Sequence, residues 1–283
     1  MGLQALMEVL PQELRTALGY LEQDRLEELR LRAGFAPTVT VGGRERPLPG
    51  VCGAVDARML EDILAAATGH SCYSAEQSLR EGFVTLQGGH RIGVCGTAAV
   101  QDGTIRALRE ISSLCIRIAG ERRQAPAELL RWLDGPVLIL GPPGSGKTTL
   151  LRECVRRLSE SGSRVSVVDA RGEIAACRAG VPQLDVGAHT DVLTGSGKAE
   201  GIMLLLRGMN PQWIAVDEIT APEDIAAMEQ ASYCGVKFLA TAHASAPDEL
   251  QKRPLYRRLC ALELFERLLI LTPDKRVRME RMA

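Results

Sequence analysis

The stretch Val137-Leu-Ile-Leu-Gly-Pro-Pro-Gly-Ser-Gly-Lys-Thr148 decides the fold. Its first four residues are apolar, as in a short buried strand, and its last eight match the phosphate-loop pattern G-x-x-x-x-G-K-[ST]. A helix is expected over residues 147–161, directly after the loop. Glycines let successive backbone N–H groups converge on phosphates, and the start of a helix adds a favourable partial charge. Because strand, loop and helix follow in that order, the stretch predicts a nucleotide site rather than an ordinary glycine turn.

The expected nucleotide-binding residues are consecutive in the chain: Gly141, Pro142, Pro143, Gly144, Ser145, Gly146, Lys147, Thr148 and Thr149. Lys147 is expected to reach the β- and γ-phosphates and to act in catalysis, and the Thr148 hydroxyl is expected to bind magnesium. The predicted cofactors are therefore ATP and Mg²⁺. No metal is expected beyond the one that the nucleotide brings.

An acidic pair follows a second apolar run. Residues 213–216 read Trp-Ile-Ala-Val, and Asp217 and Glu218 come next. At the carboxyl end of a strand, Asp217 is expected to hold the magnesium directly or through water, while Glu218 accepts a proton from the attacking water. An acidic strand end is common and means little alone, so this prediction depends on the phosphate loop upstream.

Two other strand ends carry polar residues. Asp169-Ala-Arg-Gly-Glu173 ends one apolar run, and Thr241-Ala-His243 ends another. Both are expected at the edge where doubly wound sheets bind ligands, although either could be ordinary loop chemistry. Glu173 and His243 are accordingly candidate catalytic residues. His243 could contact the γ-phosphate or relay its loss to a neighbour.

The second half of the chain has the pattern of an α/β domain. Apolar runs separated by helix-length segments occupy residues 137–140, 165–169, 213–217, 236–241 and 268–271. Such spacing predicts a mostly parallel sheet with helices on both faces. We therefore expect a RecA-like P-loop NTPase domain over residues 136–283.

A second lysine motif, Gly195-Ser-Gly-Lys198, resembles a phosphate loop but differs from it in three respects. It lacks the earlier glycine, no strand is expected before it, and Ala199 stands where a hydroxyl is required. We expect it to be a loop that caps a helix over residues 199–209.

The first half, residues 1–120, has the pattern of an α+β domain. Helices are expected over residues 11–32, where leucines recur at helical spacing, and over residues 56–68, with Asp56 as the N-cap. Hairpin turns are expected at three dipeptides: Gly42-Gly43, Gly88-Gly89 and Asp102-Gly103. Residues 121–135 are expected to form a linker and a short helix.

Composition narrows the classes of function. The chain has 283 residues, a net charge of −1 and 24% charged residues, so no bulk charge favours nucleic acid or an anionic membrane. Its eight cysteines and four histidines are scattered, without the spacing of a zinc site. The first residues lack the pattern of a cleavable signal and no apolar run reaches membrane-spanning length, so we expect neither a signal peptide nor a spanning helix. We expect a cytoplasmic protein without direct membrane insertion, peripheral to a membrane at most through partners.

The order of these motifs resembles a known group of enzymes. The phosphate loop, the acidic box (residues 169–173), Asp217-Glu218 and His243 follow one another as in the ATPases of type II and type IV secretion systems and in pilus motors. Longer strings, among them Gly-Gly-His-Arg-Ile-Gly at 88–93, are similar to the stage III sporulation protein AA family of spore-forming Firmicutes. One departure is Ala170, where that family's pattern has glutamate. It leaves open whether Asp169 or Glu173 contacts water or metal.

The resemblance implies an ATPase of the mother cell that acts with a membrane-embedded sporulation channel toward the forespore. It also implies a homo-oligomer, a hexamer, in which the N-terminal domain supplies catalytic arginines to the γ-phosphate. The arginines that match the family strings are Arg91, Arg109 and Arg117, with Arg106 a weaker match. Each of them could instead lie on a solvated strand face.

Two other functions remain open from the sequence. A nucleotide-gated scaffold would bind ATP with little turnover, but the presence of Glu218 favours hydrolysis. A nucleic-acid motor could share the RecA-like sheet, and the basic segments 252–258 and 275–281 are the features that would support it. The near-neutral charge and only 4% aromatic residues count against this second function.

Overall fold

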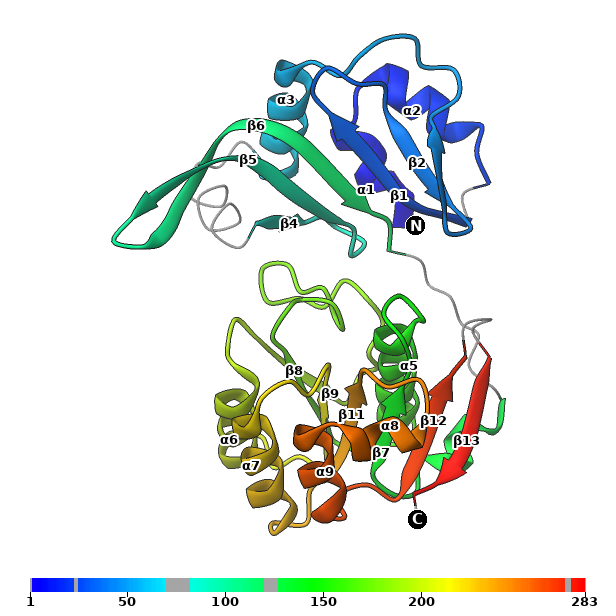
Figure 1. Cartoon of the computed structure of the whole chain (residues 1–283), viewed down its shortest axis with the longest axis vertical. Coiled ribbons are helices and arrows are strands. Elements are labelled where there is room, and N and C mark those ends of the chain that lie inside the picture. The colour runs from blue at the N-terminus through cyan, green and yellow to red at the C-terminus, as the bar shows by residue number, and fades with distance from the viewer. Residues whose placement is uncertain (1, 23–24, 70–81, 120–126, 273–275, 283) are drawn as a thin grey trace. The chain divides into compact units, whose positions relative to one another are not determined.

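The computed structural model describes residues 2–22, 25–69, 82–119, 127–272 and 276–282 (Figure 1). It consists of two compact units, Met1–Glu121 with Arg178–Gln183, and Arg122–Cys177 with Leu184–Ala283. Each unit has its own sheet and its own buried apolar residues. Of the helices within the described ranges, none has the length and hydropathy needed to cross a bilayer. The expected linker at residues 121–126 lies outside the described residues.

The N-terminal unit is built on a six-stranded antiparallel sheet with the spatial order β3-β2-β1-β6-β5-β4. The strands are β1 (Leu26–Arg32), β2 (Thr38–Val41), β3 (Arg44–Pro47), β4 (Phe83–Thr85), β5 (Arg91–Gln101) and β6 (Thr104–Arg117). Their apolar residues are buried together with those of α1 (Gly2–Val9), α2 (Gln12–Gly19) and α3 (Ala57–Ala67). The outer strand β3 reads Arg-Glu-Arg-Pro, and every one of its residues is exposed.

The prediction of a single helix over residues 11–32 is wrong in its second part. The helix α2 is short, and the chain that follows it forms β1. Leu14 and Leu18 lie four residues apart and are buried on one face of α2. Leu29 and Leu31 instead alternate with more exposed residues along β1. Pairing with β2 on one side and β6 on the other overrides the helical pattern, because a central strand buries these leucines in the sheet.

The three expected hairpin turns are confirmed. Gly42-Gly43 joins β2 to β3, Gly88-Gly89 lies between β4 and β5, and Asp102-Gly103 joins β5 to β6. Asp102 and Gly103 have φ angles of +52° and +72°, as a two-residue hairpin turn with both residues left-handed requires. Beyond the width of the other strands, β5 and β6 continue as a two-stranded arm (Figure 1).

The C-terminal unit has the predicted α/β fold. Its seven-stranded sheet has the order β13-β12-β7-β11-β10-β8-β9, and every pair is parallel except β12 with β13. The strands are β7 (Val137–Leu140), β8 (Val165–Asp169), β9 (Thr190–Thr194), β10 (Trp213–Val216), β11 (Lys237–Ala242), β12 (Arg267–Leu271) and β13 (Val277–Arg281). The two outer strands, β9 and β13, were not predicted. They lack a continuous apolar run because their side chains are only partly buried.

Helices cover both faces of this sheet (Figure 1). Side chains alternate along each strand, so neighbouring residues of β7 enter different cores. Val137 and Ile139 pack with α5 (Lys147–Glu160) and the 3-10 helix η2 (Ala127–Trp132). Leu138 and Leu140 pack with the helices of the other face: α6 (Lys198–Gly208), α7 (Pro222–Ser232), α8 (Pro247–Lys252) and α9 (Pro254–Ala261). Burial on both faces explains why these strands are continuous apolar runs.

The strand order determines which loops meet. β7, β11, β10 and β8 are parallel neighbours, so their carboxyl ends lie in one row. The loops that leave this row begin, in the same spatial order, with the phosphate loop, His243, Asp217-Glu218 and the loop after Asp169. Motifs that are far apart in the sequence are therefore adjacent at one edge of the sheet.

The cap of α3 provides a test of this fold. Asp56 Oδ1 accepts a hydrogen bond from the backbone N of Met59 at 2.6 Å. Asp56→Ala should lower the free energy of unfolding of the N-terminal unit by about 1 kcal/mol, because an N–H at the helix start loses its acceptor. Urea unfolding measures this change. Glu61→Ala, at an exposed position of the same helix, is the control, and an equal loss in both variants would contradict the capping role.

Candidate nucleotide site

The phosphate loop connects β7 to α5 and has no room for a side chain at its first residue. A Cβ atom on Gly141 would lie 2.5 Å from Ser145 Oγ. Gly146, which precedes α5, has a φ of +99°, a conformation that other residues rarely adopt. Ser145 Oγ is buried and, among the described residues, has no hydrogen-bond partner. A tight loop with a buried hydroxyl at the start of a helix fits an anionic ligand such as a phosphate group.

Lys147 is the first residue of α5, and only 5% of it is exposed. Its Nζ donates to the Pro142 carbonyl at 3.0 Å and lies 3.0 Å from His243 Nδ1. Burial lowers the pKa of this lysine, an effect that the nearby carboxylates of Glu218 and Asp217 oppose. The amine is therefore held inside the loop, close to the acidic residues of the neighbouring strands.

Two threonines orient Asp217. Thr148 Oγ1 donates to Asp217 Oδ2 at 2.7 Å, and Thr241 Oγ1 donates to Asp217 Oδ1 at 2.5 Å. Both carboxylate oxygens are thus fixed, one from α5 and one from β11. Thr148 and Asp217 present adjacent oxygen atoms beside the phosphate loop, and oxygen is the ligand that Mg²⁺ prefers. The residues present therefore fit a magnesium-bound nucleotide.

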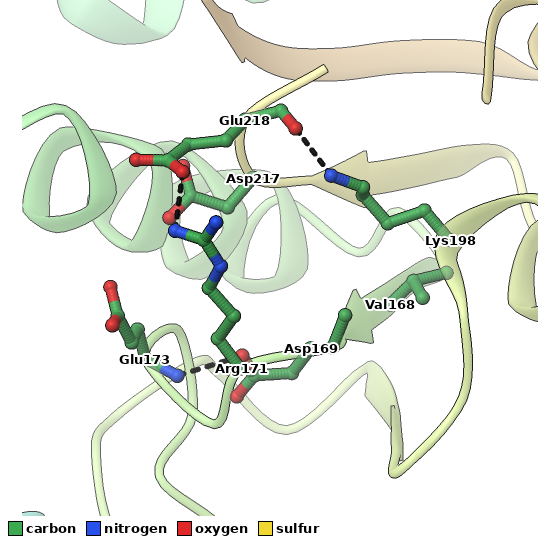
Figure 2. Close-up of a pocket in the computed structure, with 8 residues that line it drawn as sticks. Val168, Asp169, Arg171, Glu173, Lys198, Asp217 and Glu218 are labelled. Carbon is green, nitrogen blue, oxygen red and sulfur yellow. Dashed lines mark hydrogen bonds and ion pairs between the residues drawn. The ribbon is translucent and has the colours of Figure 1, made fainter. Parts of the chain in front are cut away.

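Glu218 has an unusual backbone and two charged partners. Its φ is +53°, in the left-handed region, which costs a residue with a side chain about 1–3 kcal/mol. Its Oε1 lies 2.8 Å from His243 Nε2, and its Oε2 forms an ion pair with Arg171 Nη1 (Figure 2). Desolvation acts to raise the pKa of Glu218, but Arg171, His243 and Lys147 outweigh it and hold the pKa below its usual value. The carboxylate is therefore kept ionised.

The two carboxylates of the acidic box have different surroundings. Asp169 is only 2% exposed, and its carboxylate accepts hydrogen bonds from the backbone N of Glu173, Ile174 and Ala175 at 2.9–3.1 Å. Its carboxylate therefore holds the following loop in shape. Glu173 lines the same pocket as Asp217 and Glu218 (Figure 2), and its carbonyl is fixed by Arg152 of α5.

The motif Gly195-Ser-Gly-Lys198 also contributes to this pocket, through Lys198. The expectation that no strand precedes it is wrong, because β9 ends at Thr194. Lys198 begins α6, and its Nζ donates to the carbonyl oxygen of Glu218 and to Thr220 Oγ1. The lysine thus supports the Glu218 loop.

Three residues of this site were not assigned a role from the sequence: Arg171, Lys198 and Thr241. The Thr241 hydroxyl also accepts a hydrogen bond from the backbone N of Glu218 at 2.8 Å. Arg171 lies within the acidic box, so its position next to two candidate carboxylates was a usable signal. The signal for Lys198 was a cation at the start of a helix, where the helix dipole disfavours it.

The candidate arginines belong to the N-terminal unit, whereas all the residues above lie in the C-terminal unit. Arg91 on β5 pairs across the strands with Arg117 on β6, and its guanidinium lies 3.6 Å from the centre of the Phe83 ring. Arg109 lies opposite Thr97 farther along β6. Arg109 and Arg117 are exposed.

Comparison with known proteins identifies the family. The chain matches the family "Sporulation stage III, protein AA" over residues 3–279. It belongs to this family. It is 37% identical over 283 residues to stage III sporulation protein AA of Bacillus subtilis (strain 168), spanning 95% of this chain and 90% of that protein. The type II secretion system protein HxcR of Pseudomonas aeruginosa is 35% identical over 117 residues, which are 41% of this chain and 24% of that protein.

Solved structures show that this member of the sporulation stage III protein AA family has the fold of secretion ATPases. The pilus retraction motor PilT with bound ADP has a TM-score of 0.60 at 18% identity, covering 94% of this chain and 77% of that chain. The ATPase DotB of Legionella pneumophila has a TM-score of 0.54 at 19% identity, covering 96% and 81%. The family and the fold that the sequence predicted are both confirmed.

The ion pair between Arg171 and Glu218 predicts a measurable shift. Arg171→Ala removes a positive charge that favours the ionised carboxylate, so the pKa of Glu218 should rise. Carbon-13 NMR of glutamate side chains across pH measures this, with the Glu218 signal assigned by its loss in Glu218→Gln. Arg207→Ala, at an exposed position of α6, is the control and should leave the pKa of Glu218 unchanged. An unchanged pKa in Arg171→Ala would show that this ion pair does not control the charge of Glu218.

Proposed function

We propose that the chain is a secretion-type ATPase that binds Mg-ATP at the phosphate loop and hydrolyses it. The observation that carries this proposal is the continuous set of contacts from Lys147 through His243 to Glu218, beside the hydrogen bond between Thr148 and Asp217. A phosphate-binding cation, a base and two magnesium ligands then share one edge of the sheet. Hydrolysis of a phosphoanhydride by a P-loop enzyme needs this set of groups.

In this proposal the phosphate loop binds the nucleotide, Asp217 helps to hold the metal, and Glu218 takes part in the reaction. Lys147 turns its Nζ from the Pro142 carbonyl to the β- and γ-phosphates. Thr148 and Asp217 would hold Mg²⁺, which when bound would neutralise phosphate charge. Glu218 accepts the proton of the attacking water.

His243 links the two ends of this arrangement. One ring nitrogen faces Lys147 and the other faces Glu218, so a change at the γ-phosphate that moves the lysine also alters the surroundings of the base. Glu173, which lines the same pocket as Glu218, would orient water beside it. The Asp169 carboxylate lines the same pocket but is buried and already accepts three backbone hydrogen bonds, which supports this role for Glu173 over one for Asp169.

We further propose a homo-oligomer, a hexamer, in which Arg91, Arg109 or Arg117 of the N-terminal domain supplies positive charge to the γ-phosphate. The exposure of Arg109 and Arg117 on β6 supports this assignment, since an exposed guanidinium is available to another molecule. In this scheme residues 1–120 move against the ATPase domain of residues 136–283, with residues 121–135 as the connection. The exposed basic side chains of the segments 252–258 and 276–281 then belong to the solvated surface: Lys252, Arg253, Arg257, Arg258, Arg276, Arg278 and Arg281.

The proposed cellular role follows from the family. The chain would work in the mother-cell cytoplasm, at the membrane through partners, and energise assembly of a sporulation channel or transport through it. The similarity over nearly the whole length to a stage III sporulation protein supports this role. The partners would be membrane-embedded channel proteins, and nucleic acid would not be a partner.

If Glu218 is the base, its loss should lower the rate of hydrolysis without weakening ATP binding. Glu218→Gln should lower kcat about 10²–10⁴-fold, because the water loses its proton acceptor, while ATP still binds. Turnover and the Kd of a fluorescent ATP analogue are measured on the same protein. Glu223→Gln, an exposed glutamate of α7, is the matched control and should keep full turnover. Full turnover in Glu218→Gln would contradict the assignment, and ATP binding without turnover in the unmodified protein would favour a nucleotide-gated scaffold.

The shared-site proposal predicts that turnover per subunit rises with protein concentration. Arg117→Ala should lower kcat about 10³–10⁵-fold, as loss of an arginine finger does. Arg44→Ala, an exposed arginine of β3, should have no effect. Turnover that is independent of concentration and survives Arg117→Ala would contradict the assignment. Stimulation by single-stranded DNA that disappears with added salt would favour a nucleic-acid motor instead.

A further inference from the structure

We propose that Lys198 is a positioning residue that holds Glu218 in its left-handed backbone conformation. The inference rests on the ATPase function proposed above and names a further residue on which that function depends. It also gives a role to Gly195-Ser-Gly-Lys198, the motif that resembles a second phosphate loop.

The ammonium group of Lys198 contacts the loop after β10 and the start of α7. Its side chain is 13% exposed, and Nζ donates to the Glu218 carbonyl and, at 3.0 Å, to Thr220 Oγ1. Nζ also lies 3.5 Å from Asp224 Oδ2, the carboxylate of a buried residue of α7. Two N–H donors of the ammonium group thus have hydrogen-bond acceptors, and the Asp224 carboxylate compensates its charge.

The position of Lys198 in the sequence is unfavourable without these contacts. It is the first residue of α6, and a cation at a helix N-terminus opposes the helix dipole. Burial of the charge adds a second cost. The nearby Asp224 carboxylate and the Glu218 carbonyl compensate both effects. The contacts to the Glu218 loop therefore explain why a lysine occupies this position.

The backbone of Glu218 is held from two sides. Its N–H donates to Thr241 Oγ1 of β11, and its carbonyl accepts from Lys198 of α6. Figure 2 shows Lys198 directed at the main-chain oxygen of Glu218, whereas Arg171 is directed at its side chain. Fixing both polar atoms of the peptide backbone maintains a φ that this residue would otherwise leave.

The residues after Glu218 are fixed by the same cluster. Asp224 Oδ2 accepts hydrogen bonds from the backbone N of Thr220 at 3.3 Å and of Ala221 at 3.2 Å. Lys198 thus joins the start of α6 to the start of α7 through the loop that follows Glu218. Within the described chain, the recorded polar contacts of Lys198 are all with residues 218–224. Loss of Lys198 should therefore disturb the base and leave phosphate binding intact.

Lys198→Met tests this proposal because methionine keeps an unbranched side chain and removes the donors. We expect kcat to fall about 10- to 100-fold, as a misplaced base predicts, with an unchanged Kd for ATP. Lys252→Met, an exposed lysine at the end of α8, is the matched control and should leave both quantities unchanged. In a spectrum of protein labelled with ¹⁵N-glutamate, the Glu218 amide signal, assigned by its loss in Glu218→Gln, should move only in Lys198→Met.

The two readouts separate this proposal from the ATPase function. If the unmodified protein has no turnover, the ATPase proposal fails, while the Glu218 amide signal still reports whether Lys198 holds that residue. An unmoved signal in Lys198→Met would overturn the proposal, as would a moved signal with an unchanged kcat in an active enzyme. A raised Kd for ATP with an unmoved signal would make Lys198 a phosphate ligand and overturn it. Movement of many glutamate signals at once would show that Lys198 supports the fold in general, which also contradicts the proposal.

Discussion

The parallel pairing of β7, β11, β10 and β8 is the constraint on which the site depends. A parallel sheet brings the carboxyl ends of its strands to one edge, and the connections must return over the faces as helices. Lys147 and Glu218 are separated by several such connections, yet both contact His243. A slip of one residue in any of these strands would turn its buried side chains to the other face and move the functional loop with it.

Charge compensation is the second requirement of this edge. Lys147, Arg171 and Lys198 are cations, and Asp217, Glu218 and Asp224 are the carboxylates that face them. Each buried charge is costly unless a partner and hydrogen bonds satisfy it. The carboxylates are satisfied by side chains from several helices and strands, so the site forms only when the sheet and its helices are assembled. A Glu218 with positive φ can persist for the same reason.

The sequence predicted those features that depend on local pattern. The phosphate loop, the acidic pair after Val216 and the buried strands are each encoded in a few consecutive residues, because burial on both faces requires an apolar run. β1 was mistaken for helix because its leucines also fit helical spacing, and only pairing with β2 and β6 distinguishes the two. The role of Lys198 was not visible either. It lies 20 residues before Glu218, and only the strand order brings the start of α6 to that loop.

The outer strands β3 and β13 show how the two sheets end. β3 consists of alternating charges and a proline, and β13 carries an ion pair between Arg278 and Glu280. Charged residues and proline on an edge strand oppose backbone pairing with another chain. Copies of this protein are therefore discouraged from joining into continuous sheets through these edges. At these two edges, contacts with another chain are limited to side chains, and such contacts can separate and re-form without breaking a backbone hydrogen-bond ladder.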